Sequence, residues 1–346
     1  MTQLWKWTAV IGSVFYLLCM SVVIVYAANK SVVIVENDTQ AEEGMEYLAG
    51  TEMEFTGAQE NVLRYTFGNG VAQEDVSIEY RLGAGELVLQ VTGLRDEWLL
   101  PEEVAAAEGQ VESLVRRDTE EGLEIAAKLD RYYEFESSWD EHTLELTLTR
   151  PEDRYAFIVV VNPAHGGTNI GNAVNSLREK EITMVIGAAL EKRLQDTGIK
   201  VLLTRTKDED ISTEARLEFL EDITPDLVVE IHVNADAVNE KTFGTEVYYN
   251  HIFYTRGMTN AEFADLMERE VVTAISGRAG GIFPDEEARY ALVQNAKVPA
   301  VGIEVGYLTN EAEGALLQRN DYCEKIAEGI GNGLEKAREI LDKDEE

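Results

Sequence analysis

The chain has 346 residues, of which 65 are acidic and 30 are basic, so its formal net charge is −35. This balance argues against a nucleic-acid partner, because phosphate contacts need clustered lysine and arginine. It also disfavours adsorption of the folded part to anionic lipid. The length fits two domains better than one, and 45% hydrophobic residues is enough to build their cores.

A long uncharged run lies near the start of the sequence. No residue between positions 7 and 28 is charged, which is enough chain to cross a bilayer. The apolar part of a signal peptide is shorter, at about 7–15 residues. We therefore expect residues 1–30 to form a signal anchor in preference to a cleaved signal peptide. Either form would place the rest of the chain outside the cytoplasm, anchored to the membrane or secreted.

Short segments of alternating hydrophobicity follow. Residues 86–92, 123–129 and 143–149 read as strands. A short helix is expected at 101–107, because Pro101 suits the first helical turn. We expect residues 31–152 to form a small β-rich domain.

From residue 153 to 346 the pattern changes, because apolar strands now alternate with helices. The strands are expected at 157–161, 200–203, 227–233, 245–249 and 300–305, and the helices at 179–196, 214–220, 260–276 and 322–341. Such alternation predicts an α/β domain, with a mixed, mostly parallel sheet and helices on both faces.

Polar residues stand at the ends of three of these strands. His165 follows the first strand, His232 ends the third, and Glu304 lies within the last. Open α/β sheets place their ligands at the carboxyl ends of strands, and a charge inside so apolar a strand needs a partner. Glu179 is a fourth candidate, since it begins a helix in phase with that helix's apolar face. Glu181 competes with it, because helical phase separates the two only weakly.

Two histidines and one carboxylate form a common catalytic zinc set, with one position left for water. Such a centre polarises a carbonyl and makes water nucleophilic near neutral pH. Glu304 would then be free to act as general base and proton shuttle.

The ordered set of motifs resembles the zinc-dependent N-acetylmuramoyl-L-alanine amidases of the Amidase_3 type, over about residues 155–341. The motifs are His165-Gly-Gly, Arg178-Glu-Lys, Leu203-Thr-Arg205, Arg216, Ile231-His-Val-Asn234, Gly244-Thr-Glu-Val-Tyr-Tyr249, Val298-Pro-Ala300 and Glu304-Val-Gly-Tyr-Leu-Thr-Asn310. The resemblance implies that His165, Glu179 and His232 bind Zn²⁺ and that Glu304 is catalytic. The implied reaction hydrolyses the amide between N-acetylmuramic acid and L-alanine in peptidoglycan, and so places the protein at the cell wall.

The chain departs from the family's usual pattern at three positions. Asn162 and Asn169 stand where an aspartate is usual, and Glu230 stands where a serine is usual. Strand alternation puts Glu230 on the face of His232 and Asn234, either as an extra acid near the metal or paired with a lysine or arginine. We expect a second group of residues around the metal or the substrate: Asn162, Glu230, Asn234, Arg205 and Arg216.

Other functions remain open. A protein that keeps the fold but has lost turnover would bind peptidoglycan or regulate other proteins, although it would usually have lost one of the four candidate site residues. A zinc peptidase acting on stem peptides is a further alternative, and a purely structural envelope protein would not need Glu304. Residues 250–298 leave no room for a long blocking insert, so no activator protein is expected.

Overall fold

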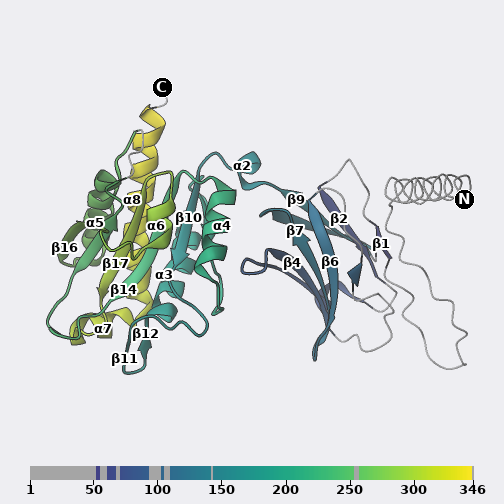
Figure 1. Ribbon diagram of the computed structural model, residues 1–346, viewed down its shortest axis with the longest axis horizontal. Helices are drawn as coiled ribbons and strands as arrows, with labels where there is room; N and C mark the ends of the chain where they lie inside the picture. The colour runs from purple at the N-terminus through teal and green to yellow at the C-terminus, as the bar shows by residue number, and fades with distance from the viewer. Residues whose placement is uncertain are drawn as a thin grey trace, which may run out of the picture. The chain divides into compact units, whose positions relative to one another are not determined.

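The computed structural model describes residues 52–54, 61–67, 71–92, 103–104, 110–141, 143–252 and 257–344. Within them the chain forms two compact units, one β-rich and one α/β, and Figure 1 labels many of their elements. The run at residues 7–28 lies outside the described residues. Within the described part, none of the helices is long and apolar enough to cross a membrane.

The β-rich unit contains two sheets. One has the order β1 (Glu52–Glu54), β2 (Val62–Thr66), β9 (Thr143–Thr149) and β8 (Glu134–Asp140); the other has the order β3 (Val76–Arg81), β4 (Glu86–Thr92), β7 (Gly122–Leu129), β6 (Val111–Asp118) and β5 (Glu103–Val104). In these sheets the pairs β1–β2, β2–β9, β5–β6 and β6–β7 are antiparallel. The short 3-10 helix η1 is Gln73–Asp75. The three strands expected from alternation are β4, β7 and β9. The helix expected at 101–107 is wrong at Glu103–Val104, which pair with β6 as strand β5.

The α/β unit repeats the predicted alternation and adds elements that the sequence did not predict. The expected strands are β10 (Ile158–Pro163), β13 (Lys200–Leu203), β14 (Leu227–Asn234), β15 (Thr245–Tyr249) and β17 (Ala300–Tyr307), and the expected helices are α3 (Glu179–Leu194), α4 (Thr213–Ile223), α5 (Asn260–Ile275) and α8 (Asn320–Asp344). The additions are α2 (Pro151–Arg154), β11 (Ala173–Val174), β12 (Leu177–Arg178), β16 (Ala279–Pro284), α6 (Ala291–Asn295) and α7 (Glu311–Leu317).

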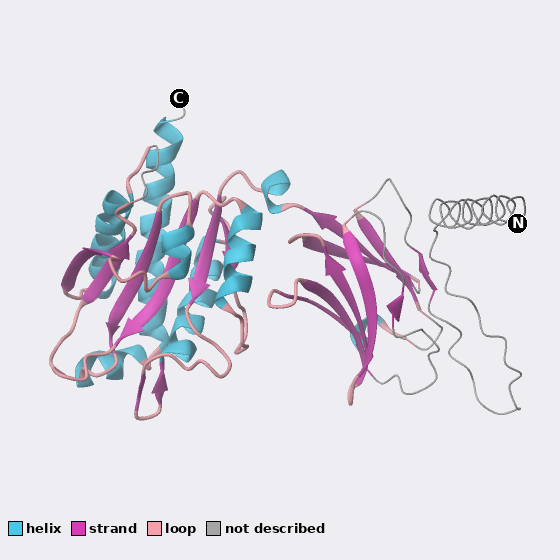
Figure 2. Cartoon of the chain, viewed as in Figure 1, coloured by secondary structure: helices cyan, strands magenta, loops and turns pink. Residues whose placement is uncertain are grey.

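The central sheet of this unit has the order β13-β10-β14-β17-β15-β16. Every neighbouring pair is parallel except β15 and β17, which are antiparallel. Figure 2 shows these strands with helices on either side of them. The predicted mixed, mostly parallel sheet between helices is confirmed.

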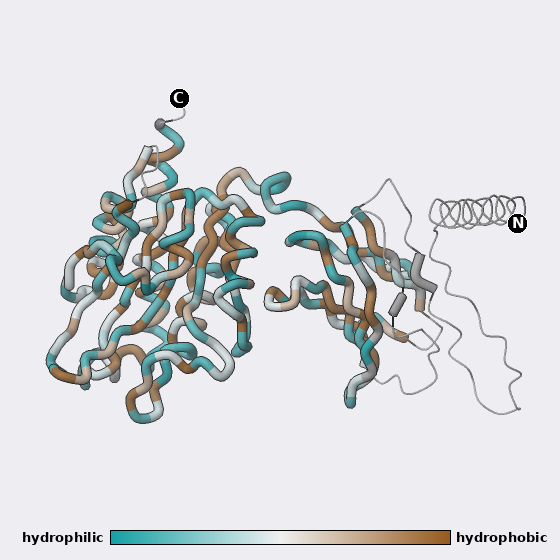
Figure 3. Tube along the Cα trace, viewed as in Figure 1, coloured by the Kyte–Doolittle hydropathy of each residue, from teal (hydrophilic) through white to brown (hydrophobic). Residues whose placement is uncertain are grey.

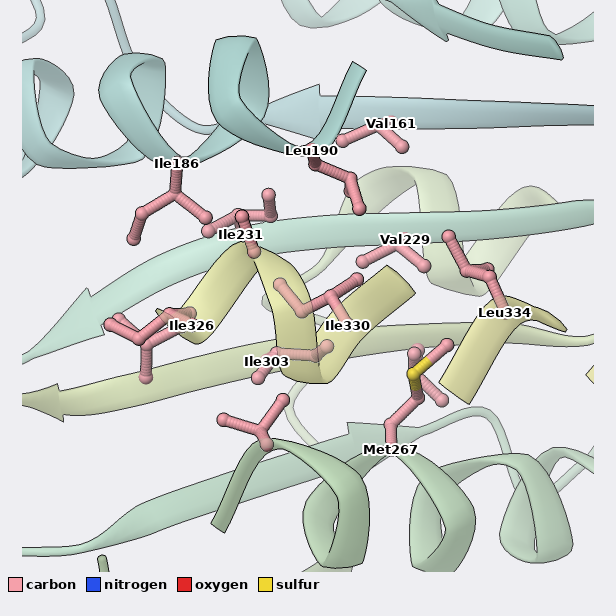
Figure 4. Packing of buried hydrophobic residues seen from close by; sticks show 14 of the residues in the cluster. Val161, Ile186, Leu190, Val229, Ile231, Met267, Ile303, Ile326, Ile330 and Leu334 are labelled. Atoms are coloured by element: carbon pink, nitrogen blue, oxygen red, sulfur yellow. The ribbon is translucent and has the colours of Figure 1, made fainter. Parts of the chain in front are cut away.

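Two separate apolar cores lie on opposite faces of this sheet. In Figure 3, brown marks the hydrophobic residues along the chain, including those of the sheet strands. Helices α3, α5 and α8 pack on one face against residues such as Val229, Ile231 and Ile303, as Figure 4 shows. Helices α4 and α6 cover the other face, where Val228 lies. Because side chains alternate along a strand, residues 230 and 232 of β14 belong to the α4–α6 face.

Candidate metal and catalytic site

Three neighbouring strands bring polar residues together on the α4–α6 face. Asn162 of β10 pairs in register with Glu230 of β14, and His232 of β14 pairs in register with Glu304 of β17. The carboxylates of Glu230 and Glu304 are buried, at 3% and 7% relative exposure. Since burying an uncompensated charge is costly, this pairing of acids with an imidazole marks a site.

The loop after β10 carries His165 in a left-handed conformation, with φ of 63°. This region costs a non-glycine residue of order 1–3 kcal/mol and persists only when the surroundings enforce it. Two buried arginines do so here. Arg205 donates to the carbonyls of Pro163 and Ala164, at 2.9 and 3.0 Å, and Arg216 donates to the carbonyl of His165 at 2.8 Å. Both therefore shape the loop through its backbone.

His165, Glu179 and His232 converge, with one ligand atom from each lying within 4.8 Å of the others. Glu179 is the bridging member, because its Oε2 lies 3.1 Å from His165 Nε2 and its Oε1 lies 3.1 Å from His232 Nδ1. The competing Glu181 is exposed and pairs with Arg178 on the helix surface. Asn169 Oδ1 lies 2.9 Å from His165 Nδ1, so that His165 presents Nε2 to the cluster.

Backbone groups fix the Glu179 carboxylate from two sides. The N–H of Asn172 donates to Oε2 at 2.8 Å, and the N–H of Val233 donates to Oε1 at 3.0 Å. Gly171 lies against the same carboxylate. A Cβ at Gly171 would lie 2.5 Å from His165 Cδ2 and 2.6 Å from Glu179 Oε2. The cluster therefore has no room for a side chain at this position.

Glu304 faces the cluster with one oxygen held and one without a hydrogen-bond partner. The hydroxyl of Tyr290 donates to its Oε1 at 2.7 Å, while its buried Oε2 has no partner in the described chain. The Tyr290 ring also packs edge-on against His232, with 5.0 Å between centroids. One carboxylate oxygen is thus available for a proton.

The electrostatics of the cluster favour a cation at its centre. Burial by itself would raise the pKa of Glu179, but hydrogen bonds from His165 and His232 outweigh burial and hold it well below its usual range. Burial would lower the pKa of His232, but Glu179 and Glu230 outweigh it and raise the pKa to about 10. Burial raises the pKa of Glu304. A proton on His232 thus supplies positive charge among three carboxylates.

The other residues predicted around the metal surround this cluster or lie beside it. Asn162 Nδ2 donates to Glu230 Oε2 at 2.7 Å, and Asn162 Oδ1 accepts from Thr204 and Arg216. The hydrogen bonds of Glu230 therefore come from Asn162 and backbone amides instead of a lysine or arginine. Asn234 donates to Glu246 at 3.4 Å and is not among the contacts of the three converging residues.

The cluster fits a zinc ion by its donor set and by one unsatisfied atom beside it. Two imidazole nitrogens and a carboxylate are the ligands of many catalytic zinc sites, which keep a fourth position open. Glu304 Oε2, beside the three converging residues, is buried without a hydrogen-bond partner in the described part of the chain. Such an atom is rare in folded proteins and marks a place where an ion or water completes the structure.

Comparison with known families shows which family the chain belongs to. The family model for N-acetylmuramoyl-L-alanine amidase, Amidase_3, matches residues 159–336, just over half of the chain. The chain belongs to this amidase family. As a member of it, the amidase hydrolyses the amide bond between N-acetylmuramic acid and L-alanine in peptidoglycan.

Individual members of the family share about a quarter of their residues with this chain over the matched region. The amidase is 26% identical over 181 residues to the N-acetylmuramoyl-L-alanine amidase CwlM of Bacillus licheniformis, covering 52% of this chain and 68% of that one. It is 27% identical over 197 residues to the germination-specific amidase of Bacillus subtilis, covering 51% and 78%. Among solved structures, the CwlD amidase of Clostridioides difficile in complex with the GerS lipoprotein is 25% identical, with 53% and 99% coverage and a TM-score of 0.49.

Sequence reasoning missed Tyr290 and Gly171. Tyr290 precedes the five-residue helix α6, and no periodic pattern marks so short an element. Gly171 lies between His165 and Glu179 in a loop, where the sequence pattern gives a glycine no role beyond forming a turn. Its left-handed φ of 67° and its closeness to both side chains become visible only in three dimensions.

Proposed function

We propose that the amidase is zinc-dependent, that His165, Glu179 and His232 hold the ion, and that Glu304 is the general base. The observation that carries this proposal is the convergence of the three side chains within 4.8 Å, beside a buried carboxylate with one unpaired oxygen. Zinc bound there would supply a Lewis acid and lower the pKa of a water molecule.

The protein's own groups account for the proton transfers. Glu304 Oε2 accepts a proton from the water that attacks the lactyl carbonyl carbon. The same carboxyl then donates that proton to the L-alanine nitrogen as the carbon–nitrogen bond breaks, so the stem peptide leaves with a free amino group. Tyr290 holds Oε1 at 2.7 Å, which leaves Oε2 oriented for both transfers.

The family's substrate implies that the α/β unit works outside the cytoplasm. We propose the division of residues 1–30, 31–152 and 153–346 into a membrane or signal segment, a β-rich domain and the catalytic domain. The uncharged residues 7–28 are the segment that would anchor the protein or be removed. That no activator protein is required also stays a prediction, based on the absence of a long insert between residues 250 and 298.

The experiment is muropeptide analysis of purified peptidoglycan incubated with the full chain, after metal removal and after addition of zinc. Zinc-dependent release of intact stem peptides with free alanine amino groups is expected. Cleavage within the stem peptide would indicate a zinc peptidase. Failure to cleave by protein shown to bind zinc would favour a binding or regulatory role.

A further inference from the structure

Glu230 is a buried acid next to His232 that the proposed chemistry does not use. Its side chain is almost inaccessible, at 3% exposure, and it lies two residues before His232 on the same face of β14. Its Oε2 lies 3.7 Å from His232 Nε2, beyond an ordinary hydrogen bond. That nitrogen has no hydrogen-bond partner in the described residues.

The protein holds both oxygens of Glu230 in place. Oε1 accepts from the backbone N–H groups of Leu292 and Val293, at 2.8 and 3.1 Å. Oε2 accepts from Asn162 Nδ2 at 2.7 Å. Asn162 cannot reverse its amide without cost, because its Oδ1 already accepts from Thr204 at 2.6 Å and from Arg216. The carboxylate is therefore fixed with Oε2 toward the His232 ring.

The two nitrogens of His232 consequently face different acids. Nδ1 lies 3.1 Å from Glu179, on the side of the converging cluster, whereas Nε2 lies on the side of Glu230. An imidazole that binds a metal through one nitrogen usually donates its other N–H to a carboxylate or carbonyl, which fixes its tautomer and orientation. Asn169 occupies the corresponding place at His165, 2.9 Å from Nδ1.

We propose that Glu230 is the positioning residue of His232, accepting the Nε2–H and so keeping Nδ1 directed at the metal. This inference rests on the proposed zinc site. It explains why an acid is buried at residue 230, held by Asn162 and the start of α6, instead of facing solvent.

The chemistry of the contacts suggests a specific substitution. Three observed donors and the proposed His232 N–H converge on Glu230. A carboxylate can accept from all of them, whereas a glutamine has only one acceptor oxygen. In Glu230→Gln the NH₂ group would therefore face other donors. These would be either the backbone N–H groups of α6 or the N–H groups of Asn162 and His232. Zinc affinity is expected to fall about 10–100-fold, as for other residues that orient metal ligands.

A second variant separates positioning from folding. In Asn162→Asp/Glu230→Gln the glutamine oxygen still accepts from α6, and its amide can donate to the new aspartate. That aspartate also accepts from Thr204 and Arg216. The buried negative charge is kept, but His232 loses its acceptor. This double variant should recover the metal-free melting temperature while its zinc affinity stays reduced. Glu270→Gln is the matched control, since Glu270 is also a buried acid, at 8% exposure, and pairs with Lys336.

The measurement is zinc affinity of the full-length protein by competition with a chelator of known affinity, together with the visible spectrum of the Co²⁺-substituted protein. A weaker zinc affinity and an altered Co²⁺ spectrum in both Glu230 variants, with Glu270→Gln like wild type, are expected. Wild-type affinity and spectrum in the folded double variant would overturn the role of Glu230 and leave the zinc site standing. A wild-type protein that binds no zinc would overturn both.

Discussion

Gly171 offers a sharp test of the site's geometry, because an added methyl group would meet two proposed zinc ligands. The Cβ of Gly171→Ala would lie 2.5 Å from His165 Cδ2 and 2.6 Å from Glu179 Oε2. Carbon atoms in contact prefer about 3.5–4.0 Å, so these groups must separate by about 1 Å. A displacement of about 1 Å at a catalytic centre costs on the order of 100-fold in rate, which corresponds to about 2.7 kcal/mol.

The backbone contributes a separate cost to stability. The φ of Gly171 is 67°, in the left-handed region, where a Cβ costs about 1–2 kcal/mol. Gly198 is the control, because its φ is 77° and its added Cβ would meet only the end of the Arg338 side chain, at 3.1 Å. Both alanine variants should lose this backbone contribution in denaturant unfolding, and Gly171→Ala should lose more because its methyl group also meets His165 and Glu179.

The assay is kcat/KM on a soluble muropeptide at saturating zinc. Gly171→Ala should lose about 100-fold, while Gly198→Ala should remain near wild type. Equal activities of the two folded variants would refute the placement of Gly171 against both ligands.

Three further outcomes are expected. Glu304→Gln should keep zinc at wild-type stoichiometry by metal analysis but lose about 10²–10⁴-fold in kcat; an active variant would contradict its role as base. Tyr290→Phe removes the hydrogen bond that lowers the pKa of Glu304 against the larger effect of burial, so the acid limb of the kcat/KM profile should move to higher pH. An unmoved limb would show that Tyr290 does not act on Glu304. Because the pKa of His232 is raised to about 10, zinc binding at pH 7.5 should release about one proton and weaken as pH falls. Calorimetry in buffers of different ionisation enthalpy measures this release, and no proton uptake by the buffer would contradict it.

The sequence predicts the parts of the fold that repeat a pattern. Helix α3 follows from hydrophobic periodicity and strands β10, β14 and β17 follow from continuous apolar runs, and Glu304 stands out because a charge interrupts an apolar strand. Periodicity cannot describe contacts through space. Hence periodicity separates Glu179 from Glu181 only weakly, whereas the structure buries Glu179 and leaves Glu181 exposed. Helix α6 is too short to produce a period.

The contacts of Glu230 likewise could not be predicted from the sequence pattern alone. Alternation placed Glu230 on the face of His232, but its partner could be found only from the register between β10 and β14, which sets Asn162 opposite it. Similarly, Arg205 and Arg216 were expected near the metal or substrate, and the structure shows them donating to loop carbonyls. Both arginines therefore act on the site by holding the backbone of the loop that carries His165.

Anomalous X-ray diffraction at the zinc edge, from crystals of the zinc-loaded amidase, tests the central claim most directly. We expect one strong peak bounded by His165 Nε2, Glu179 and His232 Nδ1, with Glu304 beside it. A peak coordinated by other residues, or none between these three in protein that analysis shows to contain zinc, would contradict it.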